Sequence, residues 1–337
     1  MRVAVMGAGG WGTALSILAG RAGHEVRLWS RNASVVEEIN RAHTNGAYLA
    51  GHELPPEISA TSEAGAALED AELVVLAAPS HATREVLTGA RPYFSAETVF
   101  VSATKGIEIE TGKRVSEIVS DVFGRERGAS RFVCLSGPSF AQEVANGQPT
   151  AVVAASCDER LSRAVQDAFS VQNFRVYTND DVTGTELGGA LKNVMALAAG
   201  IVSGLGLGSN SIAALITRGL AEMTRLAVSQ GARVETLMGL AGLGDLVLTC
   251  TGSLSRNRHV GHELGRGRTL KEVLAGMNEV AEGVRTTRAV KLLAARLGIE
   301  MPITEEVHAV LYEGKAARAA AVELMSRPLR GEFEGLI

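Results

Sequence analysis

Residues 2–21, RVAVMGAGGWGTALSILAGR, decide the fold of the first half of this chain. A strand-like apolar run, RVAVM, is followed by a GxGxxG pattern and then directly by an apolar run of helical type. In such a unit the first glycine makes the tight turn, the second lets the backbone approach a pyrophosphate, and the third lets helix and strand pack closely. The helix N-terminus also presents free N–H groups to an anion. The stretch therefore predicts dinucleotide binding by Gly7, Gly9, Gly10, Trp11 and Gly12, with Trp11 packing either over the cofactor or against the domain edge.

Short β-rich runs alternate with helical stretches through the first 180 residues, at 3–6, 26–29, 73–77, 99–102, 132–135 and 151–154. This alternation predicts a mainly parallel sheet covered by helices. Continuously apolar runs such as LVVLAA are typical of strands buried on both faces. From about residue 181, Ala, Leu, Glu and Arg recur at helical spacing, as in 212–227 and 286–297. We predict a Rossmann-type, doubly wound α/β domain over 1–180 and an all-α domain over 181–337.

The composition argues against several classes of protein. A net charge of −4 over 337 residues gives no broad basic field for a nucleic acid or an anionic membrane surface. The cysteines lie far apart and form no CxxC pair, which predicts a reducing compartment and free thiols at Cys134, Cys157 and Cys250. The N-terminal sequence lacks the pattern of a signal peptide, so we expect a cytoplasmic protein.

We expect neither a membrane span nor a metal site. The most apolar stretch, 194–207, is interrupted by three glycines. Because a membrane span needs about 20 apolar residues in a row, this stretch is interpreted as a buried helix. His259 and His262 stand at helical spacing, but no third ligand lies nearby in the sequence, so no metal is predicted.

Arg31 stands where the second β-rich run, HEVRLW, has just ended. NAD-preferring proteins usually place an Asp or Glu there, on the ribose hydroxyls, whereas an arginine can hold the 2′-phosphate of NADP. The sequence therefore predicts that NADP(H) is accepted together with, or instead of, NAD(H). The alternative is a solvated surface arginine.

Five further motifs follow in order: SATKG at 102–106, LSGPSFA at 135–141, LKN at 191–193, GLGDL at 242–246 and SRNR at 255–258. Together with GAGGWG, this ordered set resembles the NAD(P)-dependent glycerol-3-phosphate dehydrogenases of the bacterial type, and the resemblance runs essentially end to end. It implies a dinucleotide-binding domain followed by a helical domain. It also implies reversible reduction of dihydroxyacetone phosphate to sn-glycerol 3-phosphate for glycerophospholipid synthesis, and commonly a homodimer.

The resemblance assigns roles to individual residues. Proton transfer falls to Lys192, with Lys105 and Asp245 beside it in the catalytic group. The implied cofactor contacts outside the glycine loop are Lys105, Ala141, Arg256, Val280 and Glu282. The implied substrate contacts are Lys105, Gly137, Ser139, Lys192, Asn193, Asp245, Thr249, Ser255, Arg256 and Asn257.

Ketone chemistry explains why these residue types are needed. Reduction requires a proton at the developing alkoxide, and an ammonium close to that oxygen supplies both the charge and the proton. The stretch after Lys192, VMALAAGIV, has no evident wet face, so burial and the neighbouring Lys105 are expected to lower its pKa from about 10.4. Arg256 offers a planar fork for a phosphate. The alternatives are a solvated surface lysine and a solvated basic turn.

Two other classes of protein remain open at this point. One is a related two-domain reductase of another small acid, such as a 3-hydroxyacid dehydrogenase or a ketopantoate reductase, which would share only the nucleotide-binding half. The other is a non-catalytic NAD(P)-sensing protein. The SRNR and GLGD motifs argue against the first, and the pairing of Lys192 with Asp245 argues against the second.

Overall fold

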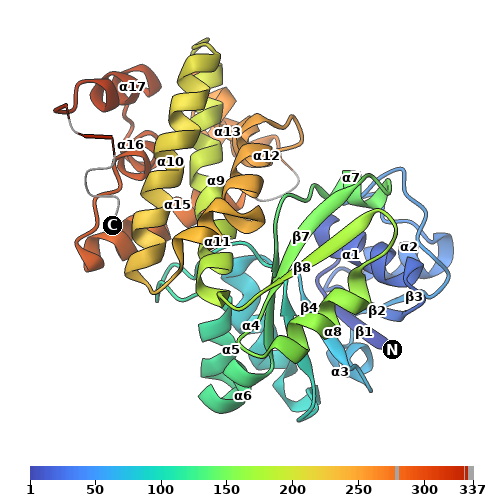
Figure 1. Ribbon diagram of the computed structural model, residues 1–337. Helices are drawn as coiled ribbons and strands as arrows, with labels where there is room; N and C mark the ends of the chain where they lie inside the picture. Colours follow the sequence, from blue (N-terminus) through green and yellow to red (C-terminus); the bar gives the residue numbers. More distant parts are fainter. Residues whose placement is uncertain (278–280, 330, 333–337) are drawn as a thin grey trace. The chain divides into compact units, whose positions relative to one another are not determined.

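The computed structural model describes residues 1–277, 281–329 and 331–332. The chain divides into two compact units (Figure 1). Met1–Thr104 and Val115–Val182 form the first, and Lys105–Arg114 and Thr183–Ile337 form the second. The segment Lys105–Arg114, which lies between two stretches of the first unit in sequence, therefore belongs by its contacts to the helical unit.

The first unit is built on one sheet of eight strands in the order β3-β2-β1-β4-β5-β6-β7-β8. Neighbouring strands are parallel except for the antiparallel pair β6 and β7. The order β3-β2-β1-β4-β5-β6 is that of a dinucleotide-binding sheet, so the predicted Rossmann-type fold is confirmed. The strands are β1 (Arg2–Met6), β2 (Glu25–Trp29), β3 (Ile58–Thr61), β4 (Leu73–Leu76), β5 (Val99–Ser102), β6 (Phe132–Ser136), β7 (Thr150–Ala155) and β8 (Phe174–Asn179).

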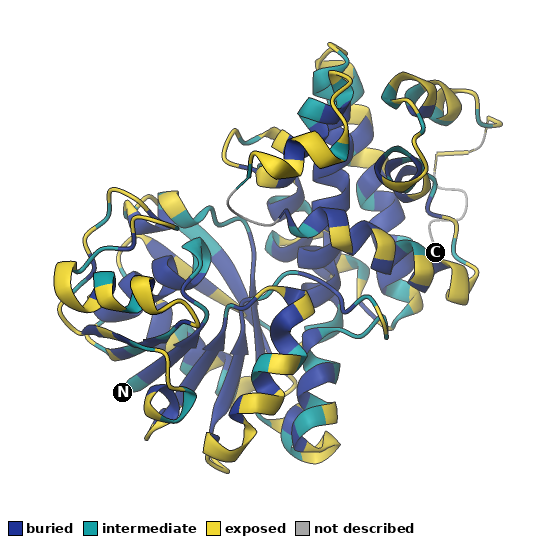
Figure 2. Cartoon of the chain, turned by 180° about the vertical axis from the view of Figure 1, so that it is seen from behind, coloured by how far each residue is buried: buried dark blue, intermediate teal, exposed yellow. Residues whose placement is uncertain are grey.

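Helices cover both faces of this sheet, and Figure 2 shows the strands as a buried layer. Along β1, Val3 and Val5 join the apolar cluster on one face, whereas Ala4 and Met6 join the cluster on the other. The helices and short turns are α1 (Gly10–Arg21), α2 (Ala33–Ala42), α3 (Ala64–Leu68), η1 (Ser80–Ala82), α4 (Thr83–Ala90), η2 (Arg91–Tyr93), α5 (Val115–Phe123), α6 (Arg125–Ser130), α7 (Ala141–Ala145) and α8 (Glu159–Phe169).

The described residues of the second unit contain helices and no strand, as the sequence predicts. They are α9 (Val182–Gly204), α10 (Ser209–Ser229), α11 (Val234–Met238), a π-helical turn η3 (Leu240–Gly244), α12 (Asp245–Thr251), α13 (Arg256–Gly265), α14 (Leu270–Ala275), α15 (Glu282–Leu297), α16 (Pro302–Tyr312) and α17 (Ala317–Met325). Within the described ranges, α9 alone is long and apolar enough to cross a membrane, and 83% of its most apolar window is buried inside this fold. It is the predicted buried helix, beginning earlier than the apolar stretch.

Helices α9 and α13 cross at backbone contact through two pairs of glycines. A Cβ on Gly200 would lie 2.1 Å from the carbonyl oxygen of Arg258, and a Cβ on Gly261 would lie 2.0 Å from that of Leu197. Gly204 and Gly265 face each other one turn further on. Because close packing leaves no room for adjustment, this crossing fixes the two helices that carry the LKN and SRNR motifs.

Candidate active site

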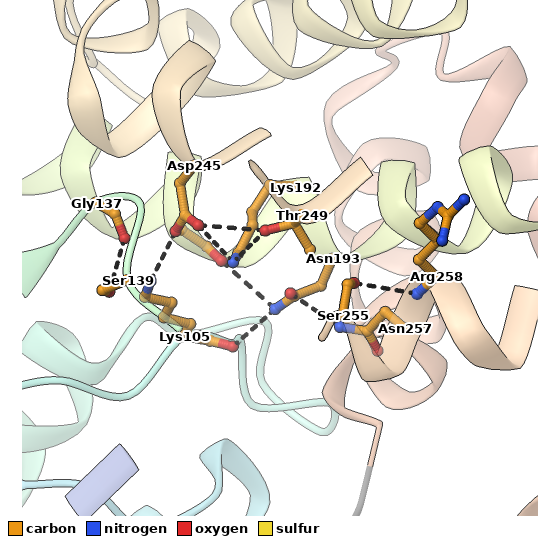
Figure 3. Close-up of polar contacts among 11 residues, drawn as sticks. Lys105, Gly137, Ser139, Lys192, Asn193, Asp245, Thr249, Ser255, Asn257 and Arg258 are labelled. Atoms are coloured by element: carbon orange, nitrogen blue, oxygen red, sulfur yellow. Dashed lines mark hydrogen bonds and ion pairs between the residues drawn. The ribbon is translucent and has the colours of Figure 1, made fainter. Parts of the chain in front are cut away.

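Lys192 lies inside the helical unit, in the buried middle of α9, with only 7% of its surface exposed. Its Nζ donates to Asp245 Oδ1 at 2.7 Å and to Thr249 Oγ1 at 2.7 Å (Figure 3). Lys105 Nζ donates to the other carboxylate oxygen, Oδ2, also at 2.7 Å. Two ammonium groups therefore share one carboxylate that is itself 1% exposed. The cluster carries a net positive charge in a buried setting.

Asp245 is brought to this place by the π-helical turn η3, which immediately precedes it in α12. Two glycines, one in this turn and one in α9 beside it, leave no space for a side chain. A Cβ on Gly242 would lie 2.0 Å from the carbonyl oxygen of Leu237, and one on Gly188 of α9 would lie 2.5 Å from that of Ala241. Gly188 thus lets the chain before Asp245 press directly against α9, and Gly242 of the GLGD motif lets the turn close on Leu237. Single π-turns of this kind are frequent at functional sites.

Burial and neighbouring charges shift the pKa values in this cluster. Burial, reinforced by the Lys105 charge, lowers the pKa of Lys192 to about 8, while Asp245 opposes the shift. Burial works to raise the pKa of Asp245, but the two ammonium groups outweigh it and hold that pKa below its usual value. Burial raises the pKa of the neighbouring Cys250 thiol to about 12. The lowered pKa suits Lys192 to proton exchange nearer neutral pH than an ordinary lysine.

Lys105 begins the segment that is held on the helical unit. Ile107 is buried in that unit's apolar core, and Arg296 of α15 donates to the carbonyl oxygen of Thr111 at 3.1 Å. Asn193, next to Lys192 on α9, donates through Nδ2 to the carbonyl oxygen of Lys105 at 3.2 Å. The segment is therefore attached by apolar packing and by hydrogen bonds, and its first residue is set opposite Asp245.

The two predicted asparagines form a chain of amide contacts. Asn257 Nδ2 donates to Asn193 Oδ1 at 3.0 Å, and the backbone N–H of Gly283 donates to Asn257 Oδ1 at 2.9 Å. Both side chains are buried. Their contacts join α9, α13 and the start of α15, so in this structure both amides are engaged with protein groups.

The SRNR motif forms the N-terminus of α13. Ser255 is the N-cap, and its Oγ accepts from the backbone N–H of Arg258 at 3.2 Å. Arg256, the first residue of the helix, is exposed. Glu282 begins α15 and is half-buried, while Val280 lies outside the described residues.

In the first unit, the glycine-rich loop has the geometry that a dinucleotide needs. Gly7 has φ +130°, and a Cβ there would lie 2.9 Å from the backbone of Ala77. A Cβ on Gly12 would lie 1.9 Å from the carbonyl oxygen of Gly7, whereas one on Gly9 would meet nothing within 4 Å. The first and third glycines are thus required by packing, and the second faces open space.

The other predicted residues of this unit follow the ends of its strands. Trp11 is half-buried and packs against the apolar core of the domain. Arg31 is exposed, two residues beyond β2. Gly137 follows β6, has φ +133°, and accepts through its carbonyl oxygen from Ser139 Oγ at 2.9 Å, while Ala141 begins α7. These positions lie at the carboxyl edge of the parallel strands, where open α/β sheets bind ligands.

Two features near the motifs were not predicted from the sequence. The contact between Thr249 and Lys192 depends on the single turn of α12 that separates Asp245 from Thr249. Only the family resemblance had indicated Thr249. Asn45, fully buried beneath the glycine-rich loop, carried no signal beyond an Asn-Gly turn pattern. Within the described ranges, no group of three or more His, Cys, Asp or Glu residues could hold a metal ion.

Comparison with known proteins identifies relatives of the whole chain. Residues 2–162 match the family model of the NAD-dependent glycerol-3-phosphate dehydrogenase N-terminus, and residues 181–322 match that of its C-terminus. Glycerol-3-phosphate dehydrogenase [NAD(P)+] of Koribacter versatilis is 55% identical over 97% of both chains. The one of Anaeromyxobacter dehalogenans is 53% identical over 99% of this chain and 100% of its own.

Among solved structures, the crystal structure of glycerol-3-phosphate dehydrogenase from Coxiella burnetii is 42% identical and superimposes with a TM-score of 0.92, covering 97% of this chain and 99% of its own. Both family models and full-length relatives above 50% identity thus agree with the two-unit fold. This chain belongs to the NAD(P)-dependent glycerol-3-phosphate dehydrogenases, which are oxidoreductases.

Proposed function

We propose that this enzyme interconverts dihydroxyacetone phosphate and sn-glycerol 3-phosphate with NAD(P)H, and that Lys192 transfers the proton. The observation that carries the proposal is the buried cluster in which Lys192 and Lys105 both donate to Asp245. Membership in the family supports the substrate pair, because full-length relatives bear the activity in their names. Two like charges around one buried carboxylate have no evident structural benefit, since an apolar replacement of a buried ionic group is often at least as stable.

The glycine-rich loop fits a dinucleotide cofactor. Gly9 leaves open space where a pyrophosphate approaches, and the first N–H groups of α1 have no partner within the helix. When bound, the reduced nicotinamide supplies the hydride. We propose further cofactor contacts from residues in both units: Gly7, Gly10, Trp11, Gly12, Arg31, Lys105, Ala141, Arg256, Val280 and Glu282.

Proton transfer by Lys192 follows from its environment. With a pKa of about 8, its ammonium form predominates at neutral pH, and it gives up a proton more readily than an ordinary lysine. Reduction of the ketone makes an alkoxide that this ammonium stabilises and then protonates. Oxidation uses the neutral amine as the base. Asp245 and Thr249 orient the Nζ through contacts of 2.7 Å, and Lys105 adds a second positive charge.

Arg256 is proposed to bind the substrate phosphate. It is exposed at the first position of α13, where its planar guanidinium and the helix N-terminus both favour an anion. Ser255 and Asn257 flank it in sequence. Asn257 donates to Asn193, which is the residue next to Lys192 on α9. Gly137 and Ser139 of the first unit are proposed as further substrate contacts through their backbone.

The domain boundary, the direction of the reaction, the compartment and the oligomeric state are proposed as follows. We propose that the nucleotide-binding and substrate domains divide at residues 180/181, that reduction for glycerophospholipid synthesis is the main direction in the cell, and that the enzyme is a cytoplasmic homodimer. The free thiols of Cys134, Cys157 and Cys250 are consistent with a reducing compartment. Light scattering on the purified protein tests the dimer, with a monomer mass contradicting it.

The decisive experiment follows the absorbance of NADPH after dihydroxyacetone phosphate is added to wild type and to Lys192→Met, which is close in length and uncharged. We expect wild type to oxidise the cofactor and the variant to lose at least about a hundredfold in kcat. The variant should still bind NADPH, because the glycine-rich loop is unchanged. Comparable kcat values in the two proteins would remove Lys192 from the mechanism, and an inactive wild type would contradict the function itself.

A further inference from the structure

Asn45 lies beneath the glycine-rich loop although it is far from the loop in sequence. Its side chain is fully buried. The Nδ2 group donates to the carbonyl oxygen of Ala8 at 3.0 Å and to Thr13 Oγ1 at 2.8 Å. Ala8 lies inside the GxGxxG turn and Thr13 in the first turns of α1. One amide group thus contacts both ends of the element that receives the cofactor phosphates.

Asn45 lies in the segment that follows α2, and contacts on either side of it hold that segment in place. Glu38 Oε1 accepts from Thr44 Oγ1 at 2.9 Å and from the backbone N–H of Gly46 at 2.7 Å, so one carboxylate holds the residues on either side of Asn45. The backbone N–H of Leu49 donates to the carbonyl oxygen of Asn45 at 2.8 Å. Because Leu49 is buried in the domain core, the whole segment is anchored independently of the glycine-rich loop.

Holding the carbonyl of Ala8 determines where the next N–H points. The Ala8 carbonyl and the Gly9 N–H belong to one planar trans peptide unit, so the two bonds point in opposite directions. With the carbonyl turned inward to a buried amide, the N–H of Gly9 is turned away from the core. Glycine adopts backbone conformations that other residues avoid, so the orientation of the peptide unit depends on the hydrogen bonds to the Ala8 carbonyl. The bond from Asn45 Nδ2, at 3.0 Å, is shorter than the one from Thr13 Oγ1, at 3.4 Å.

We propose that Asn45 is a positioning residue for cofactor binding: its amide holds the Ala8–Gly9 peptide in the orientation that offers the Gly9 N–H to a cofactor phosphate. The proposal rests on the proposed binding of NAD(P)H at this loop. An aspartate could not replace the asparagine, because its carboxylate would face the lone pairs of the Ala8 carbonyl without a donor. The residue must therefore donate at this position.

The test measures the Kd of NADPH by fluorescence titration for wild type, Asn45→Ala and Asn45→Asp. Asn40→Asp is the matched control, because Asn40 Nδ2 donates to the carbonyl oxygen of Ala60 at 2.9 Å in the same domain, remote from the loop. We expect the Kd to rise about five- to fiftyfold in both Asn45 variants, as for loss of a buried hydrogen bond, and to stay near the wild-type value in Asn40→Asp. The KM for dihydroxyacetone phosphate should change by less than about twofold.

Three results of this titration would contradict the role proposed for Asn45. A wild-type Kd in Asn45→Ala overturns the proposal, and so does a rise confined to Asn45→Asp, which would report the added charge alone. An equal rise in the Asn40 control would mean general loosening and also overturns it. If neither Asn45 variant folds, Thr13→Val removes the second acceptor of the Asn45 amide together with the 3.4 Å hydrogen bond from Thr13 Oγ1 to the Ala8 carbonyl. The Kd of this variant must rise, and Thr13→Ser must restore wild-type binding. Failure of wild type to bind NADPH or NADH contradicts the proposed function instead.

Discussion

Asp245→Asn is expected to lower the pKa of Lys192 and to move the pH profile of the reaction with it. In the wild-type structure burial and Lys105 depress that pKa, and Asp245 is the opposing influence. The substitution keeps the shape of the side chain but removes the charge that Lys192 and Lys105 contact at 2.7 Å. The buried ammonium of Lys192 and the half-buried ammonium of Lys105 would then face each other without a carboxylate between them, which favours the neutral form of Lys192.

The size of the shift follows from Coulomb's law. Two unit charges about 4 Å apart attract each other by about 4 kcal/mol at an effective dielectric constant of about 20. At about 1.4 kcal/mol per pKa unit this equals about three units for a whole carboxylate charge. Because the carboxylate serves two lysines, one through each oxygen, we expect the pKa of Lys192 to fall by about one to two units. At pH 7.5 most of the proton donor would be lost, and reduction would slow by about three- to twenty-five-fold for this reason alone.

The assay is the pH dependence of kcat/KM for dihydroxyacetone phosphate reduction between pH 5.5 and about 9.5, which reports groups of the free enzyme. Wild type should lose activity as the pH rises through about 8, where Lys192 loses its proton. In Asp245→Asn this alkaline limb should move to lower pH. Thr249→Val is the control, because it removes a hydrogen bond from Lys192 and no charge, and should shift the limb less. An alkaline limb that stays in place or moves to higher pH would show that the Asp245 carboxylate does not raise the pKa of Lys192.

Three further outcomes are expected. Gly200→Ala should destabilise the protein by at least about 2 kcal/mol in urea unfolding, since the new Cβ would lie 2.1 Å from the carbonyl oxygen of Arg258, whereas Gly89→Ala, whose Cβ meets nothing within 4 Å, should be neutral or stabilising; equal losses would contradict the close crossing. Burial raises the pKa of Glu222 to about 7 from 4.5, so its stabilising contribution is complete below pH 4.5 and is lost as the pH rises through 7. Glu222→Ala should therefore lower the free energy of unfolding more at pH 5 than at pH 8. A larger loss at pH 8 would contradict a raised pKa of Glu222. Arg31→Ala should raise the KM for NADPH by about tenfold and leave that for NADH nearly unchanged; unchanged relative values would exclude a contact with the 2′-phosphate.

The architecture could be predicted largely from local patterns. Six β-rich runs were predicted, and each coincides with a strand of the sheet. The two strands that were missed, β3 and β8, are the two edges of the sheet, where only alternate residues are buried. A strand that is apolar on one side leaves a weak signal in four to six residues. The antiparallel orientation of β7 was likewise beyond the sequence pattern, because a continuously apolar run has no direction.

The site could be predicted only in part from the sequence. The order of the motifs indicated Lys192, Lys105 and Asp245, but nothing in the sequence gave the arrangement of both ammonium groups around a single carboxylate. That arrangement spans 53 and 140 residues of chain, and it requires glycines that admit the backbone before Asp245 against α9. The contact of Asn45 with the glycine-rich loop also depends on the fold, because it forms with the Ala8 carbonyl, which points inward.

Local sequence patterns suffice to predict most of the succession of strands and helices, the dinucleotide loop and the chemical types of the site residues, because periodicity and glycine spacing act over one turn or one strand. Which charges are in contact, which amides are hydrogen-bonded and which glycines lie against another backbone become apparent once the chain is folded. Burial and Coulomb interactions depend on distance through space, and they alone bring the pKa of Lys192 to about 8.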